Sequence, residues 1–128
     1  MTLSSLLFAS LLLVSKAETA TPQFQHALPN VAGKKLVSVV VDYPPGAKSA
    51  PHRHAPSAFI YAYVLSGSIR SQLEGEPAAK IYHAGESWFE NPGAHHVVSE
   101  NASDTQSAQL LAVFVVNTDE ALTVPDAH

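Results

Sequence analysis

The stretch from Gly46 to Gly67 constrains the fold of this chain more than any other. It reads GAKSAPHRHAPSAFIYAYVLSG and joins a histidine pair to a β-prone run at 59–65. One residue separates His52 from His54, so on a β-strand both rings point to the same face. Two converging imidazoles supply half of a coordination shell for a divalent transition metal. The stretch therefore predicts strands and a metal site, against the alternative of two solvent-facing histidines in a Pro-rich loop.

A second block, residues 85–96, repeats this order of features. Its sequence GESWFENPGAHH gives a glycine, a short strand, a Pro-Gly turn and then histidine. Over residues 34–117 the two blocks together resemble the signature motifs of the cupin superfamily. The first motif is matched by Gly46, His52, His54 and Gly67, although its glutamate is absent. The second is matched by Gly85, Gly93 and His96, with Asn91 in place of its proline and Glu100 in place of its asparagine.

The resemblance implies an all-β chain folded as a double-stranded β-helix, the jelly-roll barrel of cupins. Many short β-prone runs separated by turn residues agree with it. We expect strands at 34–43, 58–66, 68–74, 78–83, 87–90, 95–99 and 108–117. The chain then divides into a lead-in or edge segment at 18–33, a cupin domain at 34–117 and a loose polar tail at 118–128.

Three histidines are the predicted metal ligands: His52, His54 and His96. The motif spacing favours His96 over its neighbour His95, which should face outward or support the ligands from behind. Three neutral imidazoles leave open positions on an ion, as in catalytic rather than structural sites. One divalent transition metal is expected, either Fe, Mn, Ni, Cu or Zn, because histidine ligation alone does not choose among them. Metal occupancy should fall as the pH drops below the ordinary histidine pKa of about 6.5.

The carboxylate of the first motif is missing. Counted from Gly67 its position falls at Ile60, and counted from His54 it falls at Ala58; both positions should face inward. Glutamate at the correct one of the two positions is expected to raise metal affinity. Glu90 is the carboxylate nearest in sequence to a motif position and is a candidate fourth ligand, although a solvent-exposed turn residue is the more common role for such a side chain.

Five aromatic residues near the motifs are expected in the core or in an interface, and an interface would make the chain a homodimer. They are Phe59, Tyr61, Tyr63, Trp88 and Phe89. Ile60, Ala62 and Val64 should face the ion and give it apolar surroundings. Such a pocket suits a small planar or apolar organic molecule better than a polyanionic sugar, which would need arginine or lysine.

The charge and cysteine content exclude several function classes. Seven Lys and Arg against eleven Asp and Glu give a net charge of −4, and the basic residues are scattered. Neutralising phosphates requires clustered basic side chains, so nucleic acid is not an expected partner. The absence of cysteine excludes disulfides, thiol nucleophiles and cysteine-based zinc sites.

Residues 1–17 are predicted to be a signal peptide. An apolar run of suitable length, residues 6–14, precedes the small residues Ser15 and Ala17 at the −3 and −1 positions of a cleavage site. A buried N-terminal helix is the alternative. Cleavage after Ala17 would give a mature chain that starts at Glu18, is secreted or periplasmic and has no membrane segment.

These features predict a secreted metal-binding cupin that acts on a small organic molecule, with dioxygenase-type activity implied by the resemblance and hydrolytic chemistry as a variant. A non-catalytic module that binds a ligand, with or without metal, is the first alternative, and the missing glutamate favours it. A metal-independent isomerase that uses histidine as a general base is the second alternative, but no suitable His–carboxylate or His–Tyr spacing is visible. Cupins host many unrelated activities, so the fold alone does not choose among these functions.

Overall fold

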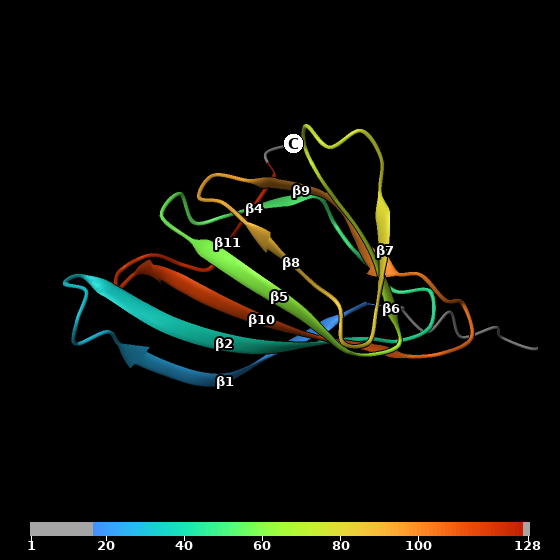
Figure 1. The fold of residues 1–128 in the computed structure, drawn as a ribbon, viewed down its shortest axis with the longest axis horizontal. Coiled ribbons are helices and arrows are strands. Elements are labelled where there is room, and N and C mark those ends of the chain that lie inside the picture. Colours follow the sequence, from blue (N-terminus) through green and yellow to red (C-terminus); the bar gives the residue numbers. More distant parts are fainter. Residues whose placement is uncertain (1–16, 127–128) are drawn as a thin grey trace, which may run out of the picture.

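A computed structural model describes residues 17–126 and shows two antiparallel sheets facing each other (Figure 1). The predicted all-β fold is confirmed, with no helix among the described residues. Within that range, accordingly, no helix has the length and apolar character needed to cross a membrane. Apart from Ala17, the predicted signal peptide lies outside the described residues.

The two sheets interleave strands that are distant in the sequence. One sheet has the order β1-β2-β10-β5-β8, and the other has the order β11-β4-β9-β6-β7, with β3 paired to β9. The strands are β1 Thr19–Ala27, β2 Lys34–Tyr43, β3 Lys48–Ser49, β4 His52–His54, β5 Phe59–Ser66, β6 Ser68–Leu73, β7 Lys80–His83, β8 Ser87–Glu90, β9 His95–Asn101, β10 Ala108–Asn117 and β11 Thr123–Pro125.

The predicted strands agree closely with this arrangement. Three of them coincide with β2, β8 and β10, and the other four differ by one or two residues at an end. The segment 18–33 contains the edge strand β1, paired with β2. The expectation of a loose tail at 118–128 is wrong at β11, which pairs with β4. Main-chain hydrogen bonds to a distant strand order this polar segment, and its side-chain pattern carries no sign of them.

Alternation of side chains explains the core between the sheets. Along β10 the even-numbered residues from Ala108 to Val116 are buried and the intervening ones are half-buried. The adjacent β5 buries Ile60, Ala62 and Val64 on the same side. Burying an aliphatic side chain of this size contributes about 1.5–3 kcal/mol. The inner faces thus hold the two sheets together around the space that contains the candidate site.

Gly67 makes the sharp connection from β5 to β6. Its φ of +70° lies in the region that residues other than glycine rarely adopt. A Cβ atom at this position would lie 2.5 Å from the carbonyl oxygen of Ser107. Only glycine fits, which explains the residue that closes the first motif.

The aromatic residues divide between the two faces of the first sheet. Trp88 is buried, but Phe59, Tyr61 and Phe89 are 40%, 44% and 58% exposed. Odd-numbered positions of β5 and β8 point away from the core, and Phe59 stacks on Phe89 there at 5.9 Å between ring centroids. These three are therefore not core residues, and their role in an interface stays a prediction.

Asn101 begins the N-glycosylation sequon Asn101-Ala102-Ser103, but its side chain is buried. Its amide nitrogen lies 2.7–3.2 Å from the carbonyl oxygens of Tyr43, Pro44 and Gln106. The nitrogen that a glycan would modify is therefore occupied in joining two loops.

Candidate metal centre

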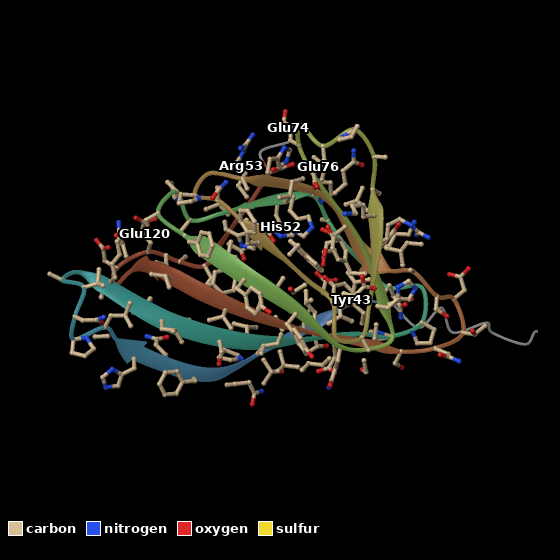
Figure 2. All side chains as sticks on the ribbon, viewed as in Figure 1. Tyr43, His52, Arg53, Glu74, Glu76 and Glu120 are labelled. Carbon is tan, nitrogen blue, oxygen red and sulfur yellow. The ribbon has the colours of Figure 1, made fainter. Side chains whose placement is uncertain are left out.

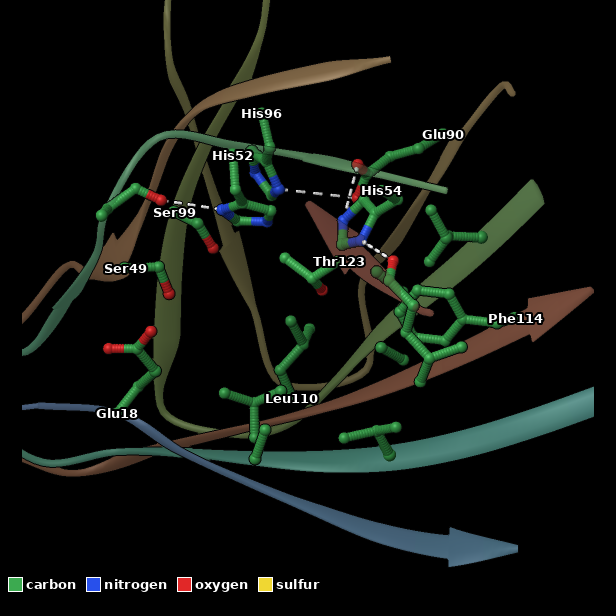
Figure 3. Close-up of a pocket in the computed structure, with 18 of the residues that line it drawn as sticks. Glu18, Ser49, His52, His54, Glu90, His96, Ser99, Leu110, Phe114 and Thr123 are labelled. Atoms are coloured by element: carbon green, nitrogen blue, oxygen red, sulfur yellow. Dashed lines mark hydrogen bonds and ion pairs between the residues drawn. The ribbon is translucent and has the colours of Figure 1, made fainter. Parts of the chain in front are cut away.

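Strands β4 and β9 bring together the three histidines that the motifs single out. His52 pairs directly with His96, and His54 lies two residues further along β4, on the same face. Their rings converge on one side of a cavity (Figure 3), and one nitrogen of each lies within 4.8 Å of the others. Two atoms that are each about 2.1 Å from one ion lie at most about 4.2 Å apart. A small further approach would therefore let one ion contact all three.

Main-chain carbonyls fix the orientation of two of these rings. The Nδ1 of His52 lies 2.8 Å from the carbonyl oxygen of Ala50, and the Nδ1 of His54 lies 3.1 Å from that of Leu122. A carbonyl oxygen can only accept, so each Nδ1 carries the hydrogen and donates it. Each Nε2 then keeps its lone pair, and the carbonyl makes it a more basic ligand.

His96 is the most deeply buried of the three rings. Its Nε2 is 2.8 Å from the hydroxyl of Ser71, which leaves Nδ1 as the nitrogen on the side of Glu90. Burial, and secondarily the neighbouring histidines, lowers the pKa of His96 to about 3. Burial also lowers the pKa of His54 to about 4. Both rings are therefore neutral over a wide pH range, which is the form that binds metal.

Glu90 is a buried carboxylate, so the expectation of a solvent-exposed turn residue is wrong. It is 2% exposed and shares the inward face of β8 with Trp88, whose indole N–H donates to Oε2 over 3.2 Å. The other oxygen, Oε1, lies 3.5 Å from Nε2 of His54 and has no hydrogen-bond partner. Burial is the main cause that raises the pKa of Glu90 to about 7.

This unpaired oxygen is evidence that the residues fit a cation. A buried polar atom without a partner is costly and rare in folded proteins. Here Oε1 of Glu90 stands beside the Nε2 lone pair of His54, so neither atom can donate to the other when the carboxyl is ionised. A divalent ion accepts electron pairs from both. Three imidazoles and one carboxylate form a donor set that suits a transition metal.

The position of Glu90 explains the missing glutamate of the first motif. In the β5–β8 ladder Glu90 is directly opposite Ile60, one of the two positions where that glutamate would fall. Both side chains are 2% exposed and both line the cavity. The neighbouring strand thus supplies a carboxylate at the level where β5 lacks one. The other position, Ala58, is buried in the core and is not part of the cavity lining.

The cavity beside the histidines has a volume of about 340 Å³. Its walls are mainly apolar and include Val39, Val41, Leu110, Ala112, Phe114 and Leu122. The hydroxyl groups of Ser49 and Ser99 each lie 2.9 Å from the hydroxyl of Tyr43. In Figure 3 these two serines line the side of the cavity between Glu18 and His52. The site is therefore an apolar chamber with nitrogen and carboxylate donors on one side and hydroxyl groups on another.

His95 points away from the cavity, as its position next to His96 suggested. Its Nδ1 lies 2.9 Å from Glu74 and its Nε2 lies 2.8 Å from Asp126. Arg53, between the two histidines of β4, is also outside and reaches Glu74, on the surface above His52 (Figure 2). The carboxylates of Asp126 and Glu74 accept hydrogen bonds from this ring and raise the pKa of His95. These charged groups tie the end of the chain to the outer face of the second sheet.

Several residues of the site could not be predicted from sequence patterns. The Leu122 contribution is a main-chain carbonyl, which any residue could offer. Glu18 and Tyr43 reach the cavity through pairings between distant segments. The sequence did contain a signal for Glu90. Residues two apart on a strand share a face, so if Trp88 is buried, Glu90 is expected to be buried as well.

Comparisons with known proteins agree with the fold. A family model described as the cupin domain matches residues 39–114, and no curated protein sequence gives a significant match. The crystal structure of DMSP lyase DddQ from Ruegeria pomeroyi DSS-3 has a TM-score of 0.59 and 22% identity, over 70% of this chain and 42% of its own. Oxalate oxidase in complex with the substrate analogue glycolate has a TM-score of 0.65 and 22% identity, over 87% and 56%.

An uncharacterized conserved protein with a double-stranded β-helix domain from Klebsiella pneumoniae is similar over most of both chains. Its TM-score is 0.66 at 20% identity, over 87% of this chain and 88% of its own. By contrast, the chain spans about half the length of the lyase and the oxidase. At these identities the likeness concerns the fold, and it confirms the predicted double-stranded β-helix.

Proposed function

The chain belongs to the cupin family, and on this premise we propose that it binds one divalent transition metal and uses it to transform a small organic molecule. The proposed ligands are His52, His54, His96 and Glu90. The observation that carries the proposal is the buried, unpaired Oε1 of Glu90, 3.5 Å from the free Nε2 of His54. It also removes the reason for favouring a non-catalytic module, because the missing motif carboxylate has a substitute.

Oxidation of the dioxygenase type is the reaction class that we propose. A bound ion would supply Lewis acidity and open coordination positions beside the cavity. The apolar walls would exclude water from this space, and the hydroxyls near Tyr43 would orient the bound molecule. A hydrolytic route through a protein nucleophile has less support. Ser71, which contacts His96, does not line the cavity, and Ser49 and Ser99 contact Tyr43 rather than a base.

Metal analysis of the chain purified without a histidine tag tests this proposal. We expect one ion per chain, lost when His52, His54 or His96 is replaced by alanine, because each removes a ligand. The His95→Ala variant is the matched control and should keep its ion, since that ring faces Glu74 and Asp126. Elemental analysis after dialysis gives the stoichiometry. Full metal content in His96→Ala would contradict the proposed ligand set.

The C-terminal strand is expected to contribute to metal affinity. A chain that ends after Ala121 loses the Leu122 carbonyl, which holds His54, and the strand paired with β4. Loss of such a supporting hydrogen bond typically costs about 10- to 100-fold in metal affinity. Competition with a chromophoric chelator measures it. As a control, Asp126→Asn weakens only the contact to His95 and should stay within about fivefold of the wild type. Unchanged affinity in a folded, truncated chain would exclude this role.

Secretion is a second part of the proposal, supported by the apolar run at 6–14 and the small residues that follow it. We expect material exported from its host to begin at Glu18. N-terminal sequencing checks this directly. Exported protein that still begins at Met1 would rule out the signal peptide.

A further inference from the structure

Within residues 17–126, the side chains that line the cavity include carboxylates but no lysine or arginine. Among the described residues of the lining, two are carboxylates, Glu18 and Glu90, and none is Lys or Arg. Glu90 belongs to the proposed ligand set. Glu18 does not, and it lies with Ser49 on the opposite side of the cavity from His54 (Figure 3). The cavity therefore has a second charged position, remote from the histidines.

The cavity walls are mainly apolar, with Leu110 on one side, but the hydroxyl groups of Ser49 and Ser99 lie on the side that runs from Glu18 toward His52 (Figure 3). A molecule that reaches from the ion toward Glu18 would bury its middle against hydrocarbon, which favours an apolar body. Its far end would approach a carboxylate with no basic side chain in the lining to offset it. Glu18 is half-exposed. An anionic group at that end would be repelled by the like charge of its carboxylate, which is unfavourable.

We infer that the cavity takes a small organic molecule whose end remote from the ion is uncharged or cationic, and that Glu18 selects against an anionic group there. This inference rests on the proposed function, because the ion is what holds the other end. It narrows the substrate class to molecules with one metal-binding oxygen group, an apolar body and a far end without negative charge. Dicarboxylates are excluded as good ligands.

Three probes with the same head and different tails test this selection. Glutarate, pentanoate and 4-aminobutanoate each present a carboxylate and three methylene groups, followed by a carboxylate, a methyl group or an ammonium group. A second series with five methylene groups covers a longer reach. Binding is measured by calorimetry on the metal-loaded chain with residues 1–17 still attached, because cleavage after Ala17 would place an α-ammonium group on Glu18 itself and offset the charge of its carboxylate. We expect the methyl and ammonium probes of at least one series to bind at least about tenfold more tightly than the dicarboxylate.

The Glu18→Gln variant separates the role of Glu18 from that of the apolar walls. Its dicarboxylate affinity should rise to within about threefold of the methyl probe. The control Glu74→Gln removes a carboxylate outside the cavity and should leave the order of the probes unchanged. Dicarboxylates that bind the wild type as tightly as the other probes in both series, or an order that Glu18→Gln does not alter, would overturn the inference. Metal content is measured first on the same sample. A chain that holds no ion refutes the proposed function. A metal-loaded chain that does not show the expected ranking of probe affinities refutes only the selection by Glu18.

Discussion

Replacing Glu90 with glutamine is expected to abolish tight metal binding and, at the same time, to stabilise the metal-free protein above pH 7. The amide keeps the size of the side chain and can still accept the hydrogen bond from Trp88. It removes the negative charge that an ion would contact. Because loss of groups that only support a ligand already costs about 10- to 100-fold, loss of this ligand should cost at least 100-fold in affinity.

The gain in stability follows from the raised pKa of Glu90. Below pH 4.5 the carboxyl is protonated in folded and unfolded chains alike, so it contributes no difference. Between pH 4.5 and about 7 the unfolded chain releases the proton and the folded chain keeps it, so the free energy of unfolding falls as pH rises. Above pH 7 the penalty is complete. A shift from 4.5 to about 7 corresponds to about 3 kcal/mol, which Glu90→Gln should recover.

Urea unfolding in the presence of a chelator at pH 5 and pH 8 measures this effect. The variant should exceed the wild type clearly at pH 8 and much less at pH 5. The control Glu74→Gln, which alters an exposed carboxylate, should change the free energy of unfolding by less than about 1 kcal/mol. A metal-free Glu90→Gln protein that is less stable than the wild type at pH 8 would show that this carboxylate is satisfied without an ion.

The same carboxyl changes the expected pH dependence of metal binding. The lowered pKa values of His54 and His96 keep these rings neutral well below pH 6.5. Glu90 must instead lose a proton to bind an ion below pH 7. Affinity should therefore fall about tenfold per pH unit below about pH 7. This loss begins at higher pH than the ordinary histidine pKa would predict.

A transfer of the carboxylate from β8 to β5 is expected to restore metal binding to Glu90→Gln. Ile60 is opposite Glu90 and also lines the cavity, so glutamate at this position can reach the same space. In Ile60→Glu alone, two carboxylates would lie side by side, about 4.5–5.5 Å apart at Cβ. The metal-free single variant should therefore lose several kcal/mol of stability, because buried charges without partners are costly. The double variant Ile60→Glu/Glu90→Gln has only one buried carboxylate, so it should avoid this additional loss of stability.

Three double variants, all built on Glu90→Gln, make this test specific. Ile60→Glu should recover most of the metal affinity, and Ile60→Gln should recover none, because it has the shape without the charge. Ala58→Glu should also fail and fold poorly, since Ala58 packs in the core away from the cavity lining. Chelator competition on the folded proteins gives the affinities. Equal recovery with glutamine, or none with glutamate in a folded protein, would mean that the carboxylate does not complete the site.

Much of the fold could be predicted from the sequence because it depends on local patterns. The apolar, β-prone run at residues 108–117 predicts a strand, and the turn residues predict where strands end. The His-x-His spacing dictates that His52 and His54 share a face. None of these inferences requires knowledge of which strands are neighbours, and each agrees with the structure.

The parts that escaped prediction depend on long-range pairing. The strand β11 has only three residues, Thr123–Pro125, and it is recognised by its pairing with β4 rather than by its own sequence. The residue type of Glu90 argued for exposure, whereas its place on β8 opposite Ile60 buries it. The motif places its glutamate on β5, but here the adjacent strand β8 supplies the carboxylate. Ladder neighbours of this kind become visible only once the strand order is known.

The ligand shell of the ion tests the central claim most directly. A crystal of the metal-loaded, full-length chain, measured at the absorption edge of its ion, locates the metal by anomalous scattering. We expect one peak per chain between the rings of His52, His54 and His96, with a carboxylate oxygen of Glu90 at about 2.0–2.2 Å if the ion is zinc. A peak that contacts the three histidines while Glu90 stays bonded only to Trp88, or no peak at this site, would contradict the account.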